Sequence, residues 1–188
     1  MDKANELIVL WDNTRKGAED SFALLHHQLY PRLFNYALKM IKDPDLAEDL
    51  LQDLFVKFWQ NKCHIGAIKN VKAYFYRSVR AMMLNHIRST QLKATKLEDM
   101  PEPELEFSKE ELMVSQEHES ELKGLLHAAL NKLPAKQREI IYMRFYQELD
   151  YLQIAEITGI RYQSVVNHVY RAVQILRESA NLSNIYAA

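Results

Sequence analysis

Residues 151–176 carry the pattern that most restricts how this chain can fold. They read YLQIAEITGIRYQSVVNHVYRAVQIL and predict two short amphipathic helices joined at Thr158-Gly159-Ile160. Glycine readily adopts the left-handed backbone conformation that a sharp corner between two helices often needs. The spacing of apolar residues predicts a buried side made of Leu152, Ala155, Ile157, Val165, Val169, Val173 and Leu176. This pattern is typical of a helix-turn-helix.

The outward side of the second predicted helix carries side chains suited to DNA. Hydrogen-bonding and cationic groups on such a helix can contact base edges and phosphates in the major groove. The residues in question are Gln163, Asn167, His168 and Arg171. The motif therefore predicts duplex DNA as a partner.

Composition and helical spacing together predict an all-α protein. The chain has 188 residues, of which 48% are apolar, with only four Gly and five Pro. Those proportions favour long helices over sheets. Helical patterns cover roughly 18–41, 44–60 and 69–89, with helix starts at Asp43-Pro44-Asp45 and Leu133-Pro134. We predict two small helical domains, residues 1–91 and 121–188, joined by a flexible acidic linker at 92–120, which contains Pro101 and Pro103.

The net charge of −1 hides a strong segregation of charge along the chain. Residues 98–121 contain ten acids and one Lys, whereas residues 62–97 contain eight Lys or Arg and no acid. Charge that can neutralise phosphates is therefore collected in one stretch, and counter-charge in another.

The basic stretch 69–89 interleaves cations with aromatic residues. Cations can follow a phosphate backbone while rings such as Tyr74, Phe75 and Tyr76 stack on unpaired bases. This combination predicts binding to single-stranded or melted DNA. The alternative is that Tyr74, Phe75, Val79 and Leu84 form a core and the cations merely face solvent.

Residues 43–61 predict a helix with an acidic face. Leu46, Leu50, Leu54, Phe55 and Phe58 share the inward side, and Asp45, Glu48, Asp49, Gln52 and Asp53 share the opposite side. Because few basic residues neutralise this face, a cationic protein partner is one explanation. A simply solvated face is the other.

No sequence pattern supports an enzyme. The chain has no P-loop, GxGxxG or nucleophile-elbow motif, and His26-His27 is poorly spaced for chelation on a helix. We therefore expect no cofactor and no metal. The single Cys63 is read as an ordinary small residue in a reducing compartment. The N-terminus lacks a signal-peptide layout and no apolar run is long enough to cross a bilayer, so we expect a cytoplasmic protein without membrane insertion.

Two long segments resemble a known family. Residues 21–61, SFALLHHQLYPRLFNYALKMIKDPDLAEDLLQDLFVKFWQN, resemble the start of region 2 of bacterial RNA polymerase sigma factors. Residues 133–172, opening on Leu133-Pro134 and containing Arg138, are similar to region 4. The acidic tether between them is typical of the extracytoplasmic-function class. The resemblance implies a transcription initiation subunit that binds core RNA polymerase, promoter DNA and an anti-sigma factor.

The resemblance also implies roles for individual residues. The clamp helices of the largest polymerase subunit would be contacted by Asp49, Leu50, Gln52 and Asp53. The melted −10 element would be held by a base-accepting loop at Asn61, Lys62 and His64, and by Lys72, Tyr74, Tyr76, Arg77, Arg80 and Arg88. The −35 element would be read by Arg161, Gln163, Ser164, Asn167, His168 and Arg171.

The chain departs from the family pattern at four positions. Ala81 and Asn85 replace frequent Asn and Asp, and Val166 and His168 replace frequently basic residues. Fewer fixed charges weaken nonspecific attraction to phosphates. Two alternatives remain open: a stand-alone helix-turn-helix regulator, which has no need of the acidic face, and a helical interaction module that has lost DNA contact.

Overall fold

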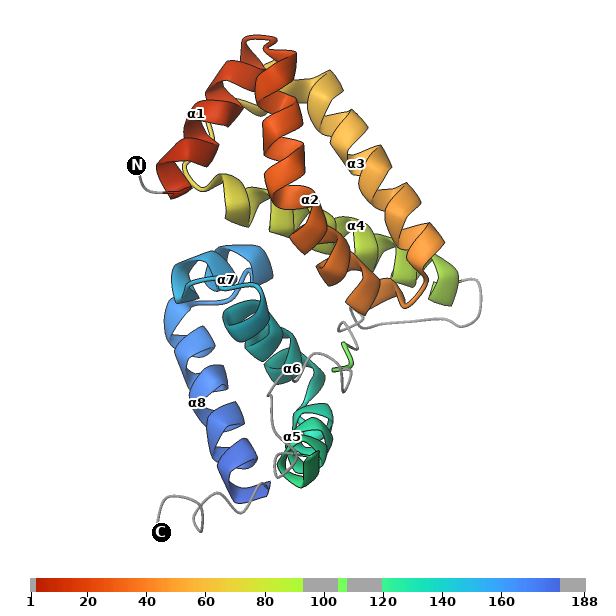
Figure 1. The fold of residues 1–188 in the computed structure, drawn as a ribbon, viewed down its shortest axis with the longest axis vertical. Coiled ribbons are helices and arrows are strands. Elements are labelled where there is room, and N and C mark those ends of the chain that lie inside the picture. Colours follow the sequence, from red (N-terminus) through yellow and green to blue (C-terminus); the bar gives the residue numbers. More distant parts are fainter. Residues whose placement is uncertain (1–2, 93–104, 108–119, 180–188) are drawn as a thin grey trace. The chain divides into compact units, whose positions relative to one another are not determined.

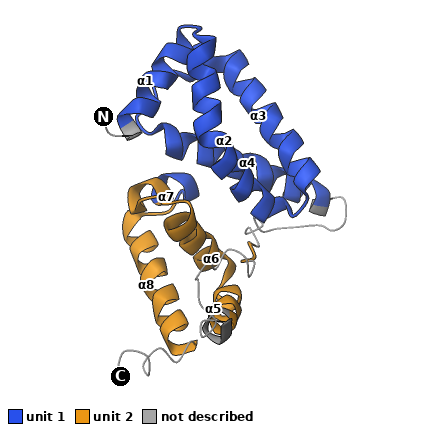
Figure 2. Ribbon diagram, viewed as in Figure 1, with its two compact units in different colours: residues 1–101, 155–159 blue, residues 102–154, 160–188 orange. Residues whose placement is uncertain are grey.

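The computed structural model describes residues 3–92, 105–107 and 120–179 (Figure 1). All regular structure in these ranges is helical, and none of the residues within them forms a strand, which confirms the all-α prediction. The chain divides into two compact units (Figure 2). One contains residues 1–101 with 155–159, and the other contains residues 102–154 with 160–188.

Four helices form the first part of the chain: α1 Lys3–Arg15, α2 Glu19–Ile41, α3 Pro44–Ile65 and α4 Val71–Leu92. The predicted helices 18–41, 44–60 and 69–89 correspond to α2, α3 and α4. Helix α1 was not predicted. It packs through Leu7, Leu10 and Trp11, whose 3–4-residue spacing places them on one buried side.

Helix α3 begins where its sequence predicts. The side chain of Asp43 caps the helix by accepting a hydrogen bond from the Leu46 amide at 3.1 Å, and Pro44 occupies the first turn. Its buried side consists of Ala47, Leu51, Leu54, Phe55 and Phe58. The helix therefore turns its acidic side to solvent.

Aromatic rings form the centre of this helical bundle. Phe75 is fully buried, and its ring centroid lies 4.2 Å from that of Phe58 and 5.9 Å from that of Trp11. Edge-to-face and tilted ring pairs of this kind add to the free energy gained by burying apolar area. The core thus ties α1, α3 and α4 together.

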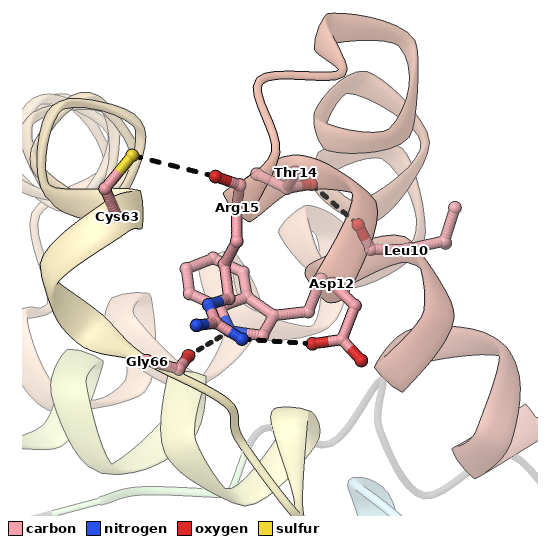
Figure 3. Close-up of polar contacts among 7 residues, drawn as sticks. Leu10, Asp12, Thr14, Arg15, Cys63 and Gly66 are labelled. Carbon is pink, nitrogen blue, oxygen red and sulfur yellow. Dashed lines mark hydrogen bonds and ion pairs between the residues drawn. The ribbon is translucent and has the colours of Figure 1, made fainter.

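The connection from α3 to α4 is fixed by α1. The indole Nε1 of Trp11 donates to the carbonyl of Gly66 at 3.0 Å. Nearby, Cys63 Sγ lies 3.6 Å from the Arg15 carbonyl, and Arg15 pairs with Asp12 at 3.4 Å (Figure 3). The start of α4 is capped by Asn70, which accepts from the Ala73 amide. These contacts hold the end of α3 against the first helix.

The elements after residue 119 are α5 Ser120–Lys132, α6 Ala135–Ile141, a π-helical segment Tyr142–Tyr146, α7 Tyr151–Thr158 and α8 Tyr162–Ser179. Helix α6 follows Leu133-Pro134, as predicted. Helix α8 packs against α5 and α6, and its buried residues are Val165, Val169 and Ala172.

Helices α7 and α8 confirm the predicted helix-turn-helix. Gly159 has a φ of 72°, and its amide closes α7 by donating to the Ala155 carbonyl at 2.9 Å. One core prediction was wrong: Leu152 is 67% exposed, and α7 instead buries Ile154 and Ile157. The short helix has room for only one buried stripe, and Leu152 lies outside it.

We expect Gly159→Ala to lower the free energy of unfolding by about 1 kcal/mol, because a side chain disfavours positive φ. Open space surrounds a Cβ placed at this position, so the loss would come from backbone strain and not from a clash. Gly124→Ala is the matched control, because Gly124 lies within α5 and also has free space around it. That control is expected to stabilise the helix. Urea titrations followed by circular dichroism compare the two, and equal effects would contradict the prediction.

Candidate nucleic-acid interface

The acidic face of α3 is exposed. Asp45, Glu48, Asp49, Gln52 and Asp53 all face solvent, while Leu50 is half-buried beneath them. The Gln52 amide donates to Glu48 at 3.0 Å. Across the described part of the chain, none of these four carboxylates forms an ion pair with a basic side chain. The face is therefore available to a cationic partner.

An apolar groove of about 630 Å³ lies between α2 and α3 beside this face. It is lined by Glu19, Phe22, Ala23, His26, Gln52, Phe55, Val56, Trp59 and Gln60. Gln52 belongs to both surfaces, and Val56 remains 53% exposed. An exposed apolar strip bordered by carboxylates is typical of a protein-binding surface.

Burial keeps the histidine of the groove uncharged. The pKa of His26 is lowered, first by burial and second by neighbouring His27, so that imidazole is neutral at pH 7. Its ring stacks on Tyr30 at 4.7 Å and meets Phe55 edge-on at 4.5 Å. Burial, with a contribution from Glu48, raises the pKa of Tyr30. The groove thus presents rings and aliphatic carbon next to the negative face.

The end of α3 differs from the prediction. Asn61, Lys62 and His64 were expected in a loop, but α3 continues to Ile65. The Lys62 ammonium donates a hydrogen bond to the Trp59 carbonyl at 2.9 Å. The same ammonium lies 3.7 Å from the centre of the Trp59 ring. Asn61 likewise donates to a carbonyl one turn earlier, at Lys57. Asn61 and His64 remain exposed, on helical backbone.

Helix α4 presents part of the predicted cationic and aromatic surface. Tyr74, Arg77 and Arg88 recur at helical spacing and are exposed or half-exposed. Ala81 and Asn85, which depart from the family pattern, are exposed on the same stripe. Lys72 and Arg80 are half-exposed on neighbouring parts of the helix.

The predicted role of Tyr76 was wrong. Its side chain is fully buried and its ring centroid lies 5.5 Å from that of Tyr36, so it cannot stack on a base. Phe75 is also sealed in the core. Tyr74 alone among the three consecutive rings retains an accessible face, with its other side 5.9 Å from Phe58.

The exposed side of α8, together with Arg161 just before the helix, gathers the predicted duplex-reading residues. Arg161, Gln163, Asn167 and Arg171 are exposed, and Ser164 and His168 are half-buried. Gln163 donates to Asn167 at 3.3 Å, one turn apart. The two amides therefore lie together on one stripe.

Tyr170 is a candidate that sequence reasoning missed. It is 64% exposed and follows Asn167 by three residues, on the same stripe as Gln163. The positions 163, 167 and 170 already had the spacing that would have identified it. A phenol hydroxyl at this position can donate to a phosphate oxygen.

Within residues 3–92, 105–107 and 120–179, no three His, Cys, Asp or Glu side chains are grouped to hold a metal ion. In the same ranges, no helix has the length and hydropathy to span a bilayer.

Two family descriptions match the chain, in order. Residues 25–92 match Sigma-70 region 2, and residues 123–176 match Sigma-70, region 4, so more than half of the chain is matched. RNA polymerase sigma factor SigV of Bacillus subtilis is 29% identical over 153 residues, covering 81% of this chain and 84% of SigV. ECF RNA polymerase sigma factor SigL of Mycobacterium tuberculosis is 29% identical over 171 residues, covering 86% of this chain and 92% of SigL.

Solved structures share the fold. The sigma factor RpoE of Bartonella quintana, solved in complex with the anti-sigma factor NepR, gives a TM-score of 0.58 at 23% identity and covers 86% of this chain and 97% of its own. CnrH, solved with the cytosolic domain of CnrY, gives a TM-score of 0.64 at 16% identity. The match covers 92% of this chain and 96% of the CnrH chain. With both sigma-70 regions present in order and relatives of near-equal length, this protein belongs to the sigma-70 family, as a member of its extracytoplasmic-function class.

Proposed function

We propose that three surfaces divide the work of this sigma factor, which directs RNA polymerase to specific promoters. The acidic face of α3 and its groove bind core polymerase, α4 with the end of α3 binds the melted −10 element, and α8 reads the −35 element. On this assignment residues 1–91 serve as region 2 and residues 121–188 as region 4. The exposed, unpaired carboxylates of α3 are the observation that carries the proposal, because a DNA-binding protein acting alone has no use for them.

Core binding is assigned to Asp49, Leu50, Gln52 and Asp53, facing the clamp helices of the largest polymerase subunit. Carboxylates at the rim of an apolar strip provide both charge complementarity and buried area. The groove beside Gln52 supplies the apolar part of that surface.

Binding of the −10 element is assigned to a smaller set than the sequence alone indicates. Tyr74 provides the stacking ring, and Arg77, Arg80, Arg88 and Lys72 provide charge for the displaced strand. Asn61 and His64 lie exposed at the end of α3, where an unstacked base would find hydrogen-bonding partners. Lys62 would first have to leave Trp59.

The −35 element is assigned to α8. Asn and Gln side chains pair in two-point fashion with adenine in the major groove. The hydrogen bond between Gln163 and Asn167 holds two such amides in register, and Arg161 and Arg171 neighbour them with positive charge. We infer a −35 element whose central contacts include adenine.

We further propose that this protein is a non-catalytic subunit without a cofactor, and that it acts in the cytoplasm together with RNA polymerase. The RpoE structure contains an anti-sigma factor, NepR, and this chain offers comparable helical units. An anti-sigma factor that covers the carboxylates of α3 would compete directly with core polymerase.

Reconstitution tests the proposal. Core polymerase with this chain is expected to select sites from a random promoter library and to give run-off transcripts from them. Core alone, and the chain alone on the same duplexes, are the controls. Tight duplex binding by the chain alone, without polymerase binding, would instead support a stand-alone regulator.

We expect Tyr74→Ala to reduce capture of single-stranded −10 DNA by the holoenzyme by about tenfold, because a base–aromatic stack is worth about 1–3 kcal/mol. Tyr74→Phe retains the ring and is expected to stay within about twofold of the wild type. Binding of a fluorescent non-template oligonucleotide measures both. Equal capture by the Ala variant and the wild type would exclude Tyr74 as the stacking residue.

A further inference from the structure

A three-residue segment inside the predicted linker lies against the second unit and buries two of its side chains there. Leu105 and Phe107 are 1% and 3% exposed, whereas Glu106 between them faces solvent. Alternation of this kind places an extended segment with one side on a core. We call residues 105–107 the clasp. The clasp lies outside the matched family regions, 25–92 and 123–176.

Side chains of α5 hold the backbone of Phe107 at both of its polar groups. Its amide donates to Asn131 Oδ1 at 2.9 Å, and its carbonyl accepts from Asn131 Nδ2 at 3.1 Å. Nε2 of His127 lies 2.8 Å from the same carbonyl. A single Asn side chain thus bonds this residue as a neighbouring strand would, which satisfies the buried backbone.

Arg138 provides a second attachment. Its Nη1 donates to the Leu105 carbonyl at 2.8 Å, and its Nη2 donates to the Leu133 carbonyl at 3.1 Å. The guanidinium therefore links the clasp to the start of α6. Hydrogen bonds from a charged donor are stronger than those between neutral groups.

A ring cluster completes the contact. The Phe107 ring lies 5.2 Å from Tyr146 and 6.0 Å from Tyr142, and these two tyrosines stack on each other at 5.5 Å. Tyr142 in turn accepts a hydrogen bond from buried Gln147. Apolar burial, backbone bonds and a fixed guanidinium together make the clasp an integral part of the second unit.

We infer that the clasp sets the length of the tether between the two DNA-binding helices, and so limits the promoter spacers that this sigma factor accepts. The inference rests on the proposed division of −10 and −35 recognition between α4 and α8. With the clasp in place, the tether runs from residue 92 to residue 105. Without it, the tether would run from residue 92 to residue 120.

Chain geometry gives the size of the effect. A fully extended chain spans at most about 3.5 Å per residue, so the clasped tether reaches roughly 45 Å and the released one roughly 100 Å. Bases along one strand are about 3.4 Å apart, so the difference corresponds to roughly 15 base pairs of spacer. Releasing the clasp therefore extends the reachable range toward longer spacers.

Amide exchange tests whether the clasp exists in solution. In the full-length protein the Phe107 amide is expected to exchange at least about 100-fold more slowly than in an unstructured peptide. Asn131→Ala removes its acceptor and is expected to abolish that protection, whereas Glu106→Gln leaves it intact. Exchange at the unstructured rate in the wild-type chain would overturn the inference.

Transcription assays test whether the clasp limits the promoter spacers that the holoenzyme accepts. Holoenzymes are compared on promoters that differ only in spacer length, after circular dichroism has established that each variant folds. The combined Leu105→Ala and Phe107→Ala variant is expected to gain at least about threefold on long spacers relative to the optimal one, and Glu106→Gln is expected to match the wild type. A second variant leaves the clasp intact and inserts 15 Gly and Ser residues between Asp99 and Met100. It is expected to broaden spacer use in the same way, because it lengthens the tether without touching the second unit.

The outcomes separate the two proposals. If the wild-type holoenzyme makes no promoter-dependent transcript at any spacer, the proposed function fails. If it does, but the insertion and the clasp variant both keep the wild-type spacer profile, the clasp does not set the spacing. A uniform loss at every spacer in the clasp variant, with no change in the insertion variant, would show structural support alone and would likewise overturn the inference.

Discussion

Exchanging both Asp49 and Asp53 for Lys is expected to weaken binding to core polymerase by at least about 100-fold. Close charge pairs at protein interfaces contribute about 1.5–7 kcal/mol each, so the loss of two amounts to about 3 kcal/mol at the low end. The substituted lysines would also repel the cations that the carboxylates attract. Fluorescence anisotropy of labelled sigma factor, titrated with core enzyme, measures the change.

A matched charge change elsewhere serves as the control. Asp20 and Glu178 are exposed acids, one in each unit and both outside the acidic face of α3. Their joint replacement by Lys changes the net charge equally and is expected to alter core affinity by less than about threefold. Similar losses in the two double variants would show that net charge, and not the α3 face, governs binding.

Replacing Gln163 and Asn167 together by Ala is expected to lower transcription from −35-dependent promoters by about 30-fold or more. A two-point contact between an amide and a base discriminates by about 1–3 kcal/mol, and two such contacts are removed. Promoters with the −35 sequence scrambled should respond little to the same variant. Run-off transcription at subsaturating holoenzyme measures both.

Arg171→Ala distinguishes reading of bases from attraction to phosphates. Loss of one phosphate contact lowers the slope of log affinity against log salt by about 1 and weakens all sequences alike. The amide variant is expected to leave that slope unchanged. If the amide variant weakened scrambled and intact −35 elements equally, these side chains would not be base readers.

Much of the fold could be predicted because local signals agreed with the tertiary structure. Asp43-Pro44 gave a start for α3 that the capping hydrogen bond confirms. Gly159 marked a corner whose positive φ the structure shows. The acidic side of α3 is exposed as predicted, since carboxylates without partners cannot be buried cheaply.

The aromatic run on α4 shows why the site was harder to predict. Three consecutive rings point in three directions around a helix, so one sequence signal combined core and surface residues. Phe75 and Tyr76 turned out to be core, and only Tyr74 remains accessible. Periodicity indicates which residues share a side, but the packing of α1 and α2 decides which side is buried.

The clasp was missed for a different reason. Leu105 and Phe107 lie in a stretch with ten acids, whose composition is typical of a linker. Their burial depends on side chains 20–33 residues further along the chain. No local pattern reports a contact of that range. The position of α1 likewise depends on a long-range contact, the hydrogen bond from Trp11 to Gly66.

The position of Phe107 divides the predicted linker into two parts, in which insertions have different consequences. Residues inserted before Leu105 would lengthen the connection between the two units. Residues inserted after Phe107 would only lengthen the chain between the clasp and α5, which belong to the same unit. Relatives whose linkers differ in total length by the same amount could therefore have different spacing requirements or identical ones, depending on which side of this phenylalanine the change falls.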